Sequence, residues 1–474
     1  MELSTADIDD LDRLCVRVLA ENWHGHATVP SGSLYPHQWS WDSAFIAFGL
    51  QHWAAQRAAA ELLSLFGGQW SDGRVPHIVF NPAVREEAYF PGPLFWRSRD
   101  IPGTPPVATS GIIQPPVHAP AALALMDHLD GAEDFASRIY PLLAAQNDYI
   151  TRHRVDPGTG LAVILHPWES GLDNSPSWDA PLAAVPADLS LFDRFTRRDL
   201  DHAGEGERPT NDDYARYIRL ALAYRDHGYN DEWARAEAEF VVIDPAFNSL
   251  WARSELSLVQ IARRIGVDAT DHARTADRIT TALQGHLFDP TIGVAHAYDV
   301  RTGQLQFEST VGGALPLLLP GLAPSYVQRI VDALTGPGFD IQRPSVSGVP
   351  SFDRTSPKYD PTRYWRGPSW MNTTWLVAGG LRRQGFRELA DKLDRDVLAL
   401  AHQAGLREYF NPDTGTGHGT LAAAEQRATR PVGAALGPGS APDRSLRGRH
   451  EHGEHHLPRV RTSVTDRAAG GGAQ

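Results

Sequence analysis

One stretch decides the fold class: Leu250-Trp-Ala-Arg-Ser-Glu-Leu-Ser-Leu-Val-Gln-Ile-Ala-Arg-Arg-Ile265. Its apolar residues recur every three or four positions, which places them on one face of an α-helix. The stretch Ala276 to Leu287, which follows after a short break, has the same spacing. The two stretches therefore predict consecutive helices, each with an apolar face to bury.

The same spacing recurs along the rest of the chain. It is found in seven further stretches: Ile8 to Leu19, Ala121 to His128, Ile139 to Ile150, Tyr214 to Tyr224, Val327 to Leu334, Trp370 to Leu381 and Leu389 to Ala404. The alternation typical of strands is almost absent, apart from a short predicted hairpin at Val294 to Phe307 that turns at Arg301-Thr302-Gly303. The predicted fold class is therefore all-α.

A weak repeat accompanies these helices. The turn pattern Asx-Pro-x-x-Gly occurs at Asp156 to Gly160, Asp289 to Gly293 and Asn411 to Gly415, each soon after a helical stretch. Proline presets φ and glycine takes positive φ, so a helix can end there and the chain can reverse. Such turns are common, so chance is one explanation. The other is a ring of helical hairpins with equivalent loops on one rim.

Composition excludes several classes of protein. The 474 residues carry a formal net charge of −13, which argues against nucleic acid as a partner and favours a neutral or small molecule. No stretch approaches the roughly 20 apolar residues of a membrane span, and the acidic N-terminus does not resemble a signal peptide. The single cysteine, Cys15, predicted to lie in the core, fits a reducing compartment. We expect a cytoplasmic protein.

Three long segments rich in aromatic residues, proline and glycine separate the predicted helices. They are Gly67 to His118, His166 to Asn211 and Ser345 to Pro368. Loops of this length in a compact domain usually have a function. We expect them to form the wall and lid of an active site.

The first motif with chemical content is Tyr35-Pro-His-Gln-Trp-Ser-Trp-Asp42. Its rings can stack on the C–H face of a sugar, and its carboxylate can accept hydrogen bonds from sugar hydroxyls. Alternatively, Asp42 caps a helix that begins near Ser43 and the tryptophans belong to the core.

The second motif is His166-Pro-Trp-Glu-Ser-Gly-Leu-Asp-Asn-Ser-Pro-Ser-Trp-Asp179. It combines three carboxylates with two rings: Glu169, Asp173 and Asp179 with Trp168 and Trp178. An apolar ring beside a carboxyl group disfavours the ionised form, as a general acid at neutral pH requires. The alternative is a simple Asx-turn at Asp173-Asn174-Ser175-Pro176.

The third motif is Tyr364-Trp-Arg-Gly-Pro-Ser-Trp-Met-Asn-Thr-Thr-Trp375, which offers Arg366 and Asn372 as polar contacts among three tryptophans. It is either part of a sugar site or a buried aromatic wall.

The fourth motif, Leu406-Arg-Glu-Tyr-Phe-Asn-Pro-Asp-Thr-Gly415, follows a helical stretch. We expect Glu408 to lie at the end of that helix. A carboxylate is unfavourable at the negative end of the helix dipole, so this placement mildly favours a functional role for Glu408.

Metal, nucleotide and nucleophile sites are not predicted. The imidazoles of Arg447 to His456 lie in a stretch without hydrophobic periodicity, and no phosphate-binding glycine loop or Gly-x-Ser-x-Gly elbow is present. We therefore expect no metal and no cofactor.

At these four motifs the sequence resembles the bacterial branch of glycoside hydrolase family 63, which includes the mannosylglycerate and glucosylglycerate hydrolases. The resemblance covers roughly residues 10 to 420, and the motifs occur in the order typical of the family. It implies an (α/α)6 barrel over residues 1–420, a small cap formed by the loops at about 67–118 and 166–211, and hydrolysis of an α-glycosidic bond with inversion.

The resemblance also implies roles for individual residues. Asp173 corresponds to the general acid and Glu408 to the base that activates water. Sugar binding falls to Tyr35, Trp39, Trp41, Asp42, Gln114, Trp168, Gly171, Tyr364 and Trp365. Arg208 and Tyr214 match the segment that binds glycerate, and the guanidinium fork suits a carboxylate. Glucosylglycerate is the first expected substrate and mannosylglycerate the second.

The sequence departs from the family after Gly417-His-Gly419. Family members continue with a Phe/Ser-Trp-Thr-Ala segment and a final helix, whereas residues 421–474 predict a disordered tail in place of that helix. We interpret the change as a frameshift or sequence error near residue 420. Two alternatives follow: a sugar-binding or inactive remnant, and a hydrolase of another α-linked oligosaccharide.

Overall fold

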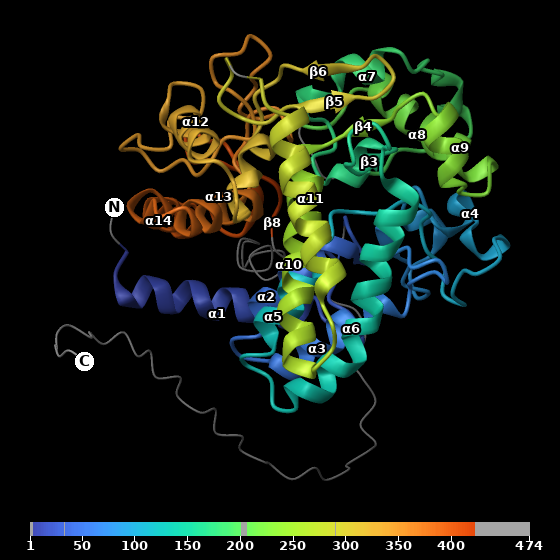
Figure 1. Cartoon of the computed structure of the whole chain (residues 1–474), viewed down its shortest axis with the longest axis horizontal. Helices are drawn as coiled ribbons and strands as arrows, with labels where there is room; N and C mark the ends of the chain where they lie inside the picture. The colour runs from blue at the N-terminus through green and yellow to red at the C-terminus, as the bar shows by residue number, and fades with distance from the viewer. Residues whose placement is uncertain (1–2, 33, 201–205, 290, 422–474) are drawn as a thin grey trace, which may run out of the picture. The chain divides into compact units, whose positions relative to one another are not determined.

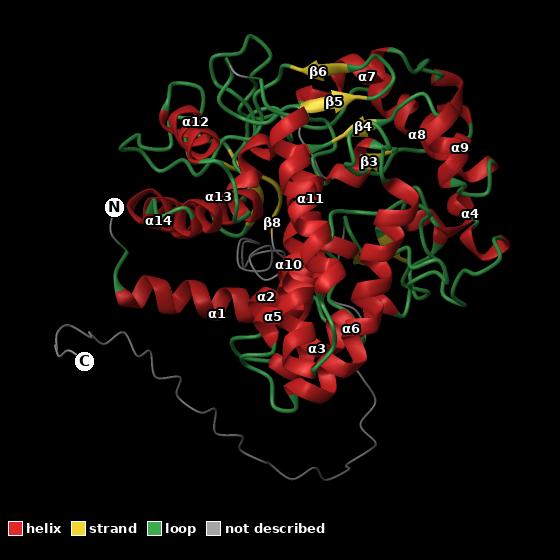
Figure 2. Cartoon of the chain, viewed as in Figure 1, coloured by secondary structure: helices red, strands yellow, loops and turns green. Residues whose placement is uncertain are grey.

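The computed structural model describes residues 3–32, 34–200, 206–289 and 291–421, and helices predominate among them (Figure 2). The α-helices are α1 Thr5–Glu21, α2 Ser40–Leu50, α3 Ala55–Phe66, α4 Pro93–Trp96, α5 His118–Leu125, α6 Ala132–Tyr149, α7 Asp179–Ala183, α8 Asn211–Asp226, α9 Asp231–Glu237, α10 Pro245–Ile265, α11 Thr270–His286, α12 Pro324–Thr335, α13 Met371–Arg383 and α14 Arg387–Ala404. No helix among the described residues is both long and apolar enough to cross a membrane.

The strands are short. They are β1 Gln38–Trp39, β2 Ile78–Val79, β3 Val163–Ile164, β4 Val242–Ile243, β5 Ala297–Asp299, β6 Gln304–Gln306, β7 Arg407–Phe410 and β8 Gly417–Leu421. They form antiparallel pairs β1–β2 and β7–β8 and a four-stranded sheet in the order β3-β4-β5-β6. The hairpin predicted around Arg301-Thr302-Gly303 is confirmed as β5 and β6.

Helix α10 lies at the centre of the helical packing. It packs against α5, α6 and α11, and Figure 1 shows α10 and α11 side by side. Asp244 caps its start by accepting hydrogen bonds from the amides of Ala246 and Phe247, and Gly266, with φ of 72°, ends it. The stretch Leu250 to Ile265 is thus confirmed as a helix with an extensively buried face.

The other predicted helical stretches are also confirmed, with small shifts at their ends. Helix α3 was not predicted, although it buries Leu62, Leu65 and Phe66 on one face. Consecutive helices pack as pairs, namely α2 with α3, α10 with α11 and α13 with α14. Cys15 is exposed on α1, so its predicted place in the core was wrong.

Glu408 lies on strand β7, so its predicted place at a helix end was wrong. Gly405, with φ of 81°, follows the last residue of α14, and the chain then pairs β7 with β8. The turn Asn411 to Gly415 therefore closes a hairpin between two strands rather than ending a helix. The dipole argument for Glu408 does not apply.

The long segments contain short regular elements. Helix α4 and two 3₁₀ turns lie between residues 67 and 118, while the segment from 166 to 211 holds the turns η4 Pro167–Ser170 and η5 Pro176–Trp178 and helix α7. The predicted disordered tail lies outside the described residues, apart from Leu421 at the end of β8.

Candidate active site

A pocket with an empty volume of about 740 Å³, part of it open to solvent, brings together residues from distant parts of the chain. Eight of the predicted site residues line it: Tyr35, Trp39, Gln114, Trp168, Asp173, Arg208, Tyr214 and Tyr364.

Asp173 lies between the turns η4 and η5, and the main chain around it is well anchored. The hydroxyl of Tyr217 donates to the Asp173 carbonyl at 3.0 Å, and the indole N–H of Trp178 donates to the Leu172 carbonyl at 2.8 Å. The hydrogen bond at the turn runs from the amide of Ser175 to the carbonyl of Leu172. These bonds fix the loop that presents the Asp173 side chain to the pocket.

The structure separates the three carboxylates of this motif. Glu169 is fully buried and pairs with Arg154, whereas Asp179 forms a two-pronged pair with Arg366. Of the three, only Asp173 lines the pocket. It is therefore the carboxylate of this motif that a ligand can reach.

Burial sets the protonation of two carboxyl groups. It raises the pKa of Asp173 to about 7, against the opposing charge of Arg208 and with a further contribution from Glu408. Burial likewise raises the pKa of Asp42 to about 7, with a smaller contribution from Glu408. Each group is therefore partly protonated near neutral pH, as a proton donor must be.

Glu408 lies beside the pocket and is held by two residues that line it. The hydroxyl of Tyr35 donates to its Oε1 at 2.8 Å, and Arg208 Nη2 lies 2.8 Å from its Oε2. Arg208 Nη1 also donates to Tyr35 Oη at 3.1 Å. The Glu408 side chain is 10% exposed, so these bonds act in a largely dry environment.

Aromatic rings form much of the pocket wall. Trp168 makes an edge contact with Tyr214 at 6.1 Å between centroids, and Trp39 makes one with Tyr35 at 5.3 Å. The indole N–H of Trp39 is buried without a hydrogen-bond partner among the described residues. A buried donor without a partner is costly, and a ligand oxygen would satisfy it.

Comparison with known proteins identifies the family. The sequence model described as "Mannosylglycerate hydrolase MGH1-like glycoside hydrolase domain" matches residues 35–426. A mannosylglycerate hydrolase from Rubrobacter radiotolerans is 36% identical over 419 residues, which cover 87% of this chain and 94% of that protein. The chain belongs to this family. It is therefore a glycoside hydrolase.

Other members of the MGH1-like family extend the comparison. A glucosylglycerate hydrolase from Mycolicibacterium hassiacum is 32% identical, over 85% of this chain and 93% of that protein. A family 63 mannosylglycerate hydrolase from Thermus thermophilus, solved in complex with Tris and D-glycerate, is 39% identical with a TM-score of 0.79. That match covers 87% of this chain and 97% of the other. The same Thermus enzyme has also been solved in complex with glucose.

Five predicted site residues of this family member do not line the pocket: Trp41, Asp42, Gly171, Trp365 and Glu408. Trp41 packs against Gly171, where a Cβ atom would lie 2.5 Å from the Trp41 ring. Trp365 is buried and stacks on Trp370 with a centroid distance of 4.0 Å. Asp42 lies in the first turn of α2, whose N-cap is Trp39, so it does not cap that helix.

Several pocket residues were missed by the sequence prediction: Leu34, His77, Tyr89, Phe90, Pro91, Arg198, Asp199 and Pro209. Tyr89 and His77 lie in the first long segment, and Arg198 and Asp199 in the second. Burial lowers the pKa of His77 well below its usual value, so its imidazole is neutral. Only the length and composition of the two segments indicated that they form the wall of the site. No motif within them pointed to these particular residues.

Among the described residues no group of three His, Cys, Asp or Glu side chains is arranged to hold a metal ion. The polar groups of the pocket are carboxyl, guanidinium, hydroxyl, amide and imidazole groups. This set suits hydrogen bonding to a polyhydroxylated ligand with an acidic substituent.

Proposed function

We propose that this glycoside hydrolase cleaves the α-glycosidic bond of glucosylglycerate and mannosylglycerate, with inversion, to give the hexose and glycerate. The observation that carries the proposal is the joint presence of Asp173, Arg208 and a set of rings in one pocket. A carboxyl group can protonate the leaving oxygen, a guanidinium can hold the carboxylate of glycerate, and the rings can stack on the sugar.

Asp173 is the proposed general acid. Its pKa of about 7 supports this role, because a substantial fraction stays protonated near neutral pH. Asp42 has a similar pKa, but only Asp173 lines the pocket. The Asp173 carboxyl donates its proton to the glycosidic oxygen as the bond to the anomeric carbon breaks.

Glu408 is the proposed base. It removes a proton from water while the water oxygen bonds to the anomeric carbon on the face opposite the leaving group. Inverting enzymes separate their carboxyl groups by roughly 6.5–9.5 Å to admit this water. The hydrogen bond from Tyr35 and the ion pair with Arg208 support a fixed orientation of the Glu408 carboxylate.

Arg208 is the proposed anchor for the glycerate carboxylate, and Tyr214 is the second residue proposed to contact it. Both residues line the pocket, and the Arg208 side chain is 2% exposed. A guanidinium suits an anionic aglycone because its planar fork donates charged hydrogen bonds to a carboxylate. The Thermus relative has been solved in complex with D-glycerate, which supports the proposal that this chain also binds glycerate.

The chain is similar to hydrolases of both sugars. The 36% identity to a mannosylglycerate hydrolase and the 32% identity to a glucosylglycerate hydrolase do not support a preference for glucosylglycerate. We therefore propose both as substrates. Measuring kcat/KM for glucosylglycerate, mannosylglycerate and kojibiose with purified protein ranks them. Comparable values for all three would remove the proposed glycerate specificity.

Product analysis tests the reaction itself. We expect release of hexose and glycerate, with the β-anomer of the hexose as the first product seen by proton NMR. First release of the α-anomer would contradict inversion. Ligand binding by folded protein without any release of hexose would favour the sugar-binding alternative.

We also propose that the packed helix pairs belong to an (α/α)6 ring, and that residues 67–118 and 166–211 act as its cap over a catalytic domain of residues 1–420. The packed pairs of consecutive helices α2–α3, α10–α11 and α13–α14 support the ring. The cap is supported by the pocket residues that these two segments contribute.

A further inference from the structure

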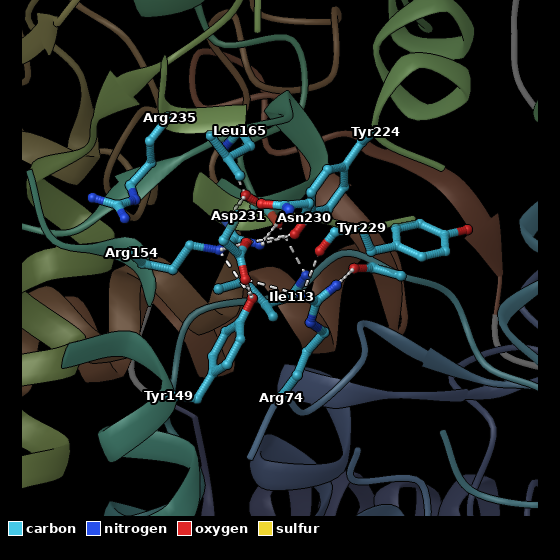
Figure 3. Close-up of polar contacts among 12 residues, drawn as sticks. Arg74, Ile113, Tyr149, Arg154, Leu165, Tyr224, Tyr229, Asn230, Asp231 and Arg235 are labelled. Carbon is cyan, nitrogen blue, oxygen red and sulfur yellow. Dashed lines mark hydrogen bonds and ion pairs between the residues drawn. The ribbon is translucent and has the colours of Figure 1, made fainter. Parts of the chain in front are cut away.

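A network of buried charged side chains lies close to the pocket and anchors the main chain there. It consists of two cations and two carboxylates, whose side chains are at most 3% exposed: Arg74, Arg154, Glu169 and Asp231. Figure 3 shows Arg74 and Arg154 converging on Asp231. The formal charges balance, which such a burial requires.

Glu169 uses both of its oxygens fully. Arg154 Nη1 donates to Oε2 at 2.7 Å and Nη2 donates to Oε1 at 2.8 Å. The amide of Ile113 donates to Oε1 at 3.1 Å, and the amide of Leu165 donates to Oε2 at 2.7 Å. Four donors therefore fix one carboxylate that is fully shielded from solvent. Glu169 cannot reach a ligand, so any effect on catalysis must be indirect.

The two amides belong to different segments, and each segment continues to a residue that lines the pocket. Ile113 directly precedes Gln114, which lines the pocket and accepts a hydrogen bond from the amide of Trp41 at 3.1 Å. Leu165 begins the segment that runs through η4 to Asp173. One carboxylate thus connects the segment that carries Asp173 to the wall that carries Gln114.

We propose that Glu169, held by Arg154, is a positioning residue that sets the location of Asp173 relative to the sugar-binding wall. The inference rests on the proposed function of Asp173 as the acid. A bidentate guanidinium–carboxylate pair restricts both distance and orientation, so it can transmit a fixed geometry through four residues of chain.

The other half of the network supplies a matched control. In the described part of the chain, Asp231 accepts from Arg74, Arg154, Tyr149 and Tyr224. It holds the same charge as Glu169 in the same network, yet these partners lie outside the segment from Leu165 to Asp173. Asp231 holds Arg154 at Nε, whereas Glu169 is bonded by Nη1, Nη2 and two main-chain amides. Loss of the Asp231 charge therefore removes one contact to Arg154 and leaves the four donors to Glu169 in place.

The experiment compares Glu169→Gln with Asp231→Asn on hexosylglycerate. For folded Glu169→Gln we expect kcat to fall on the order of 10²-fold with KM nearly unchanged, because small displacements of an acid cost rate more than binding. The pH at which kcat declines should also move below about 7, since a loosened Asp173 gains solvent. Asp231→Asn should retain kcat within about threefold and keep the wild-type pH profile.

Equal kcat losses in the two variants, or an unmoved pH profile in Glu169→Gln, would overturn the inference. If Glu169→Gln does not fold, Arg154→Lys keeps the charge but cannot bond both oxygens of Glu169, and the same shift in pH profile is expected. A crystal structure of Glu169→Gln or of Arg154→Lys gives a readout without turnover. Displacement of residues 165–173 relative to Gln114 supports the inference, and an unmoved segment overturns it. Wild-type protein that releases no hexose contradicts the proposed function instead.

Discussion

Arg208 holds both oxygens of Glu408, with Nη2 2.8 Å from Oε2 and Nη1 3.3 Å from Oε1. The cation proposed for the glycerate carboxylate therefore already has a carboxylate partner within the protein. A substrate carboxylate that reaches Arg208 must share the guanidinium with Glu408 or displace Glu408 from it. Binding of the aglycone and orientation of the base are thus coupled through one side chain.

Replacing Arg208 with Gln should separate anionic from neutral substrates. We expect kcat/KM for glucosylglycerate to fall by about 10- to 10²-fold, because a hydrogen bond to a charged group contributes about 1.5–3 kcal/mol. The value for glucosylglycerol, which lacks the carboxylate, should fall much less. Steady-state kinetics on both substrates measures this. An unchanged ratio between them would mean that Arg208 serves only Glu408.

Replacing Asp173 with Asn should abolish proton donation but preserve the pocket. We expect kcat to fall by about 10²- to 10⁴-fold, while the affinity for glycerate, measured by calorimetry, changes little. Asp179→Asn is the matched control, because Asp179 lies in the same motif and pairs with Arg366 away from the pocket. Near-normal turnover in Asp173→Asn would remove Asp173 as the acid.

The pH dependence follows from the raised pKa of Asp173. Burial brings that pKa to about 7, and the protonated form is the active one, so kcat should fall as pH rises through about 7. Asp42 has a similar pKa, so the variant Asp42→Asn decides which carboxyl group causes the decline. We expect the residual kcat of that variant, measured from about pH 5 to about pH 9, to keep the decline. Its disappearance would assign the decline to Asp42.

Much of the helical fold could be predicted because α10 and its neighbours carry their own signals. The apolar spacing of Leu250 to Ile265, the capping Asp244 and the terminating Gly266 are all local features. Strand β7 could not be predicted in this way, since its pairing with β8 is a relation between two segments and each is only a few residues long. Glu408 was therefore assigned to the wrong element although its motif was recognised.

Site residues could be predicted where a short motif combines several aromatic and charged residues. Tyr35 and Asp173 belong to such motifs, and the structure places both in the pocket. His77 has no motif of its own. It reaches the pocket because β2 pairs with β1, and its carbonyl accepts a hydrogen bond from the amide of Ser40 at 2.9 Å. Trp41 and Trp365 also belong to dense motifs, but neither lines the pocket. A motif alone does not reveal which of its rings lie at the pocket surface.

The packing of Trp41 beneath the acid loop gives a last prediction, for Gly171→Ala. Gly171 has φ of 71°, and a Cβ atom there would lie 2.5 Å from the Trp41 ring. Gly266→Ala is the matched control, because Gly266 has φ of 72° and nothing within 4 Å of the added atom. The control should lose about 1–2 kcal/mol of unfolding free energy from the backbone alone, with normal kcat. Gly171→Ala should lose a further ~1–3 kcal/mol, because the ring or the loop must move.

That movement should also reach Asp173, which lies two residues along the chain. We therefore expect kcat of Gly171→Ala to fall by about 10²-fold while Gly266→Ala turns over normally. Chemical denaturation and steady-state kinetics on the two purified variants measure both effects. Equal losses of stability in the two variants, with equal kcat, would show that the Trp41 contact yields easily and does not hold the acid loop in place.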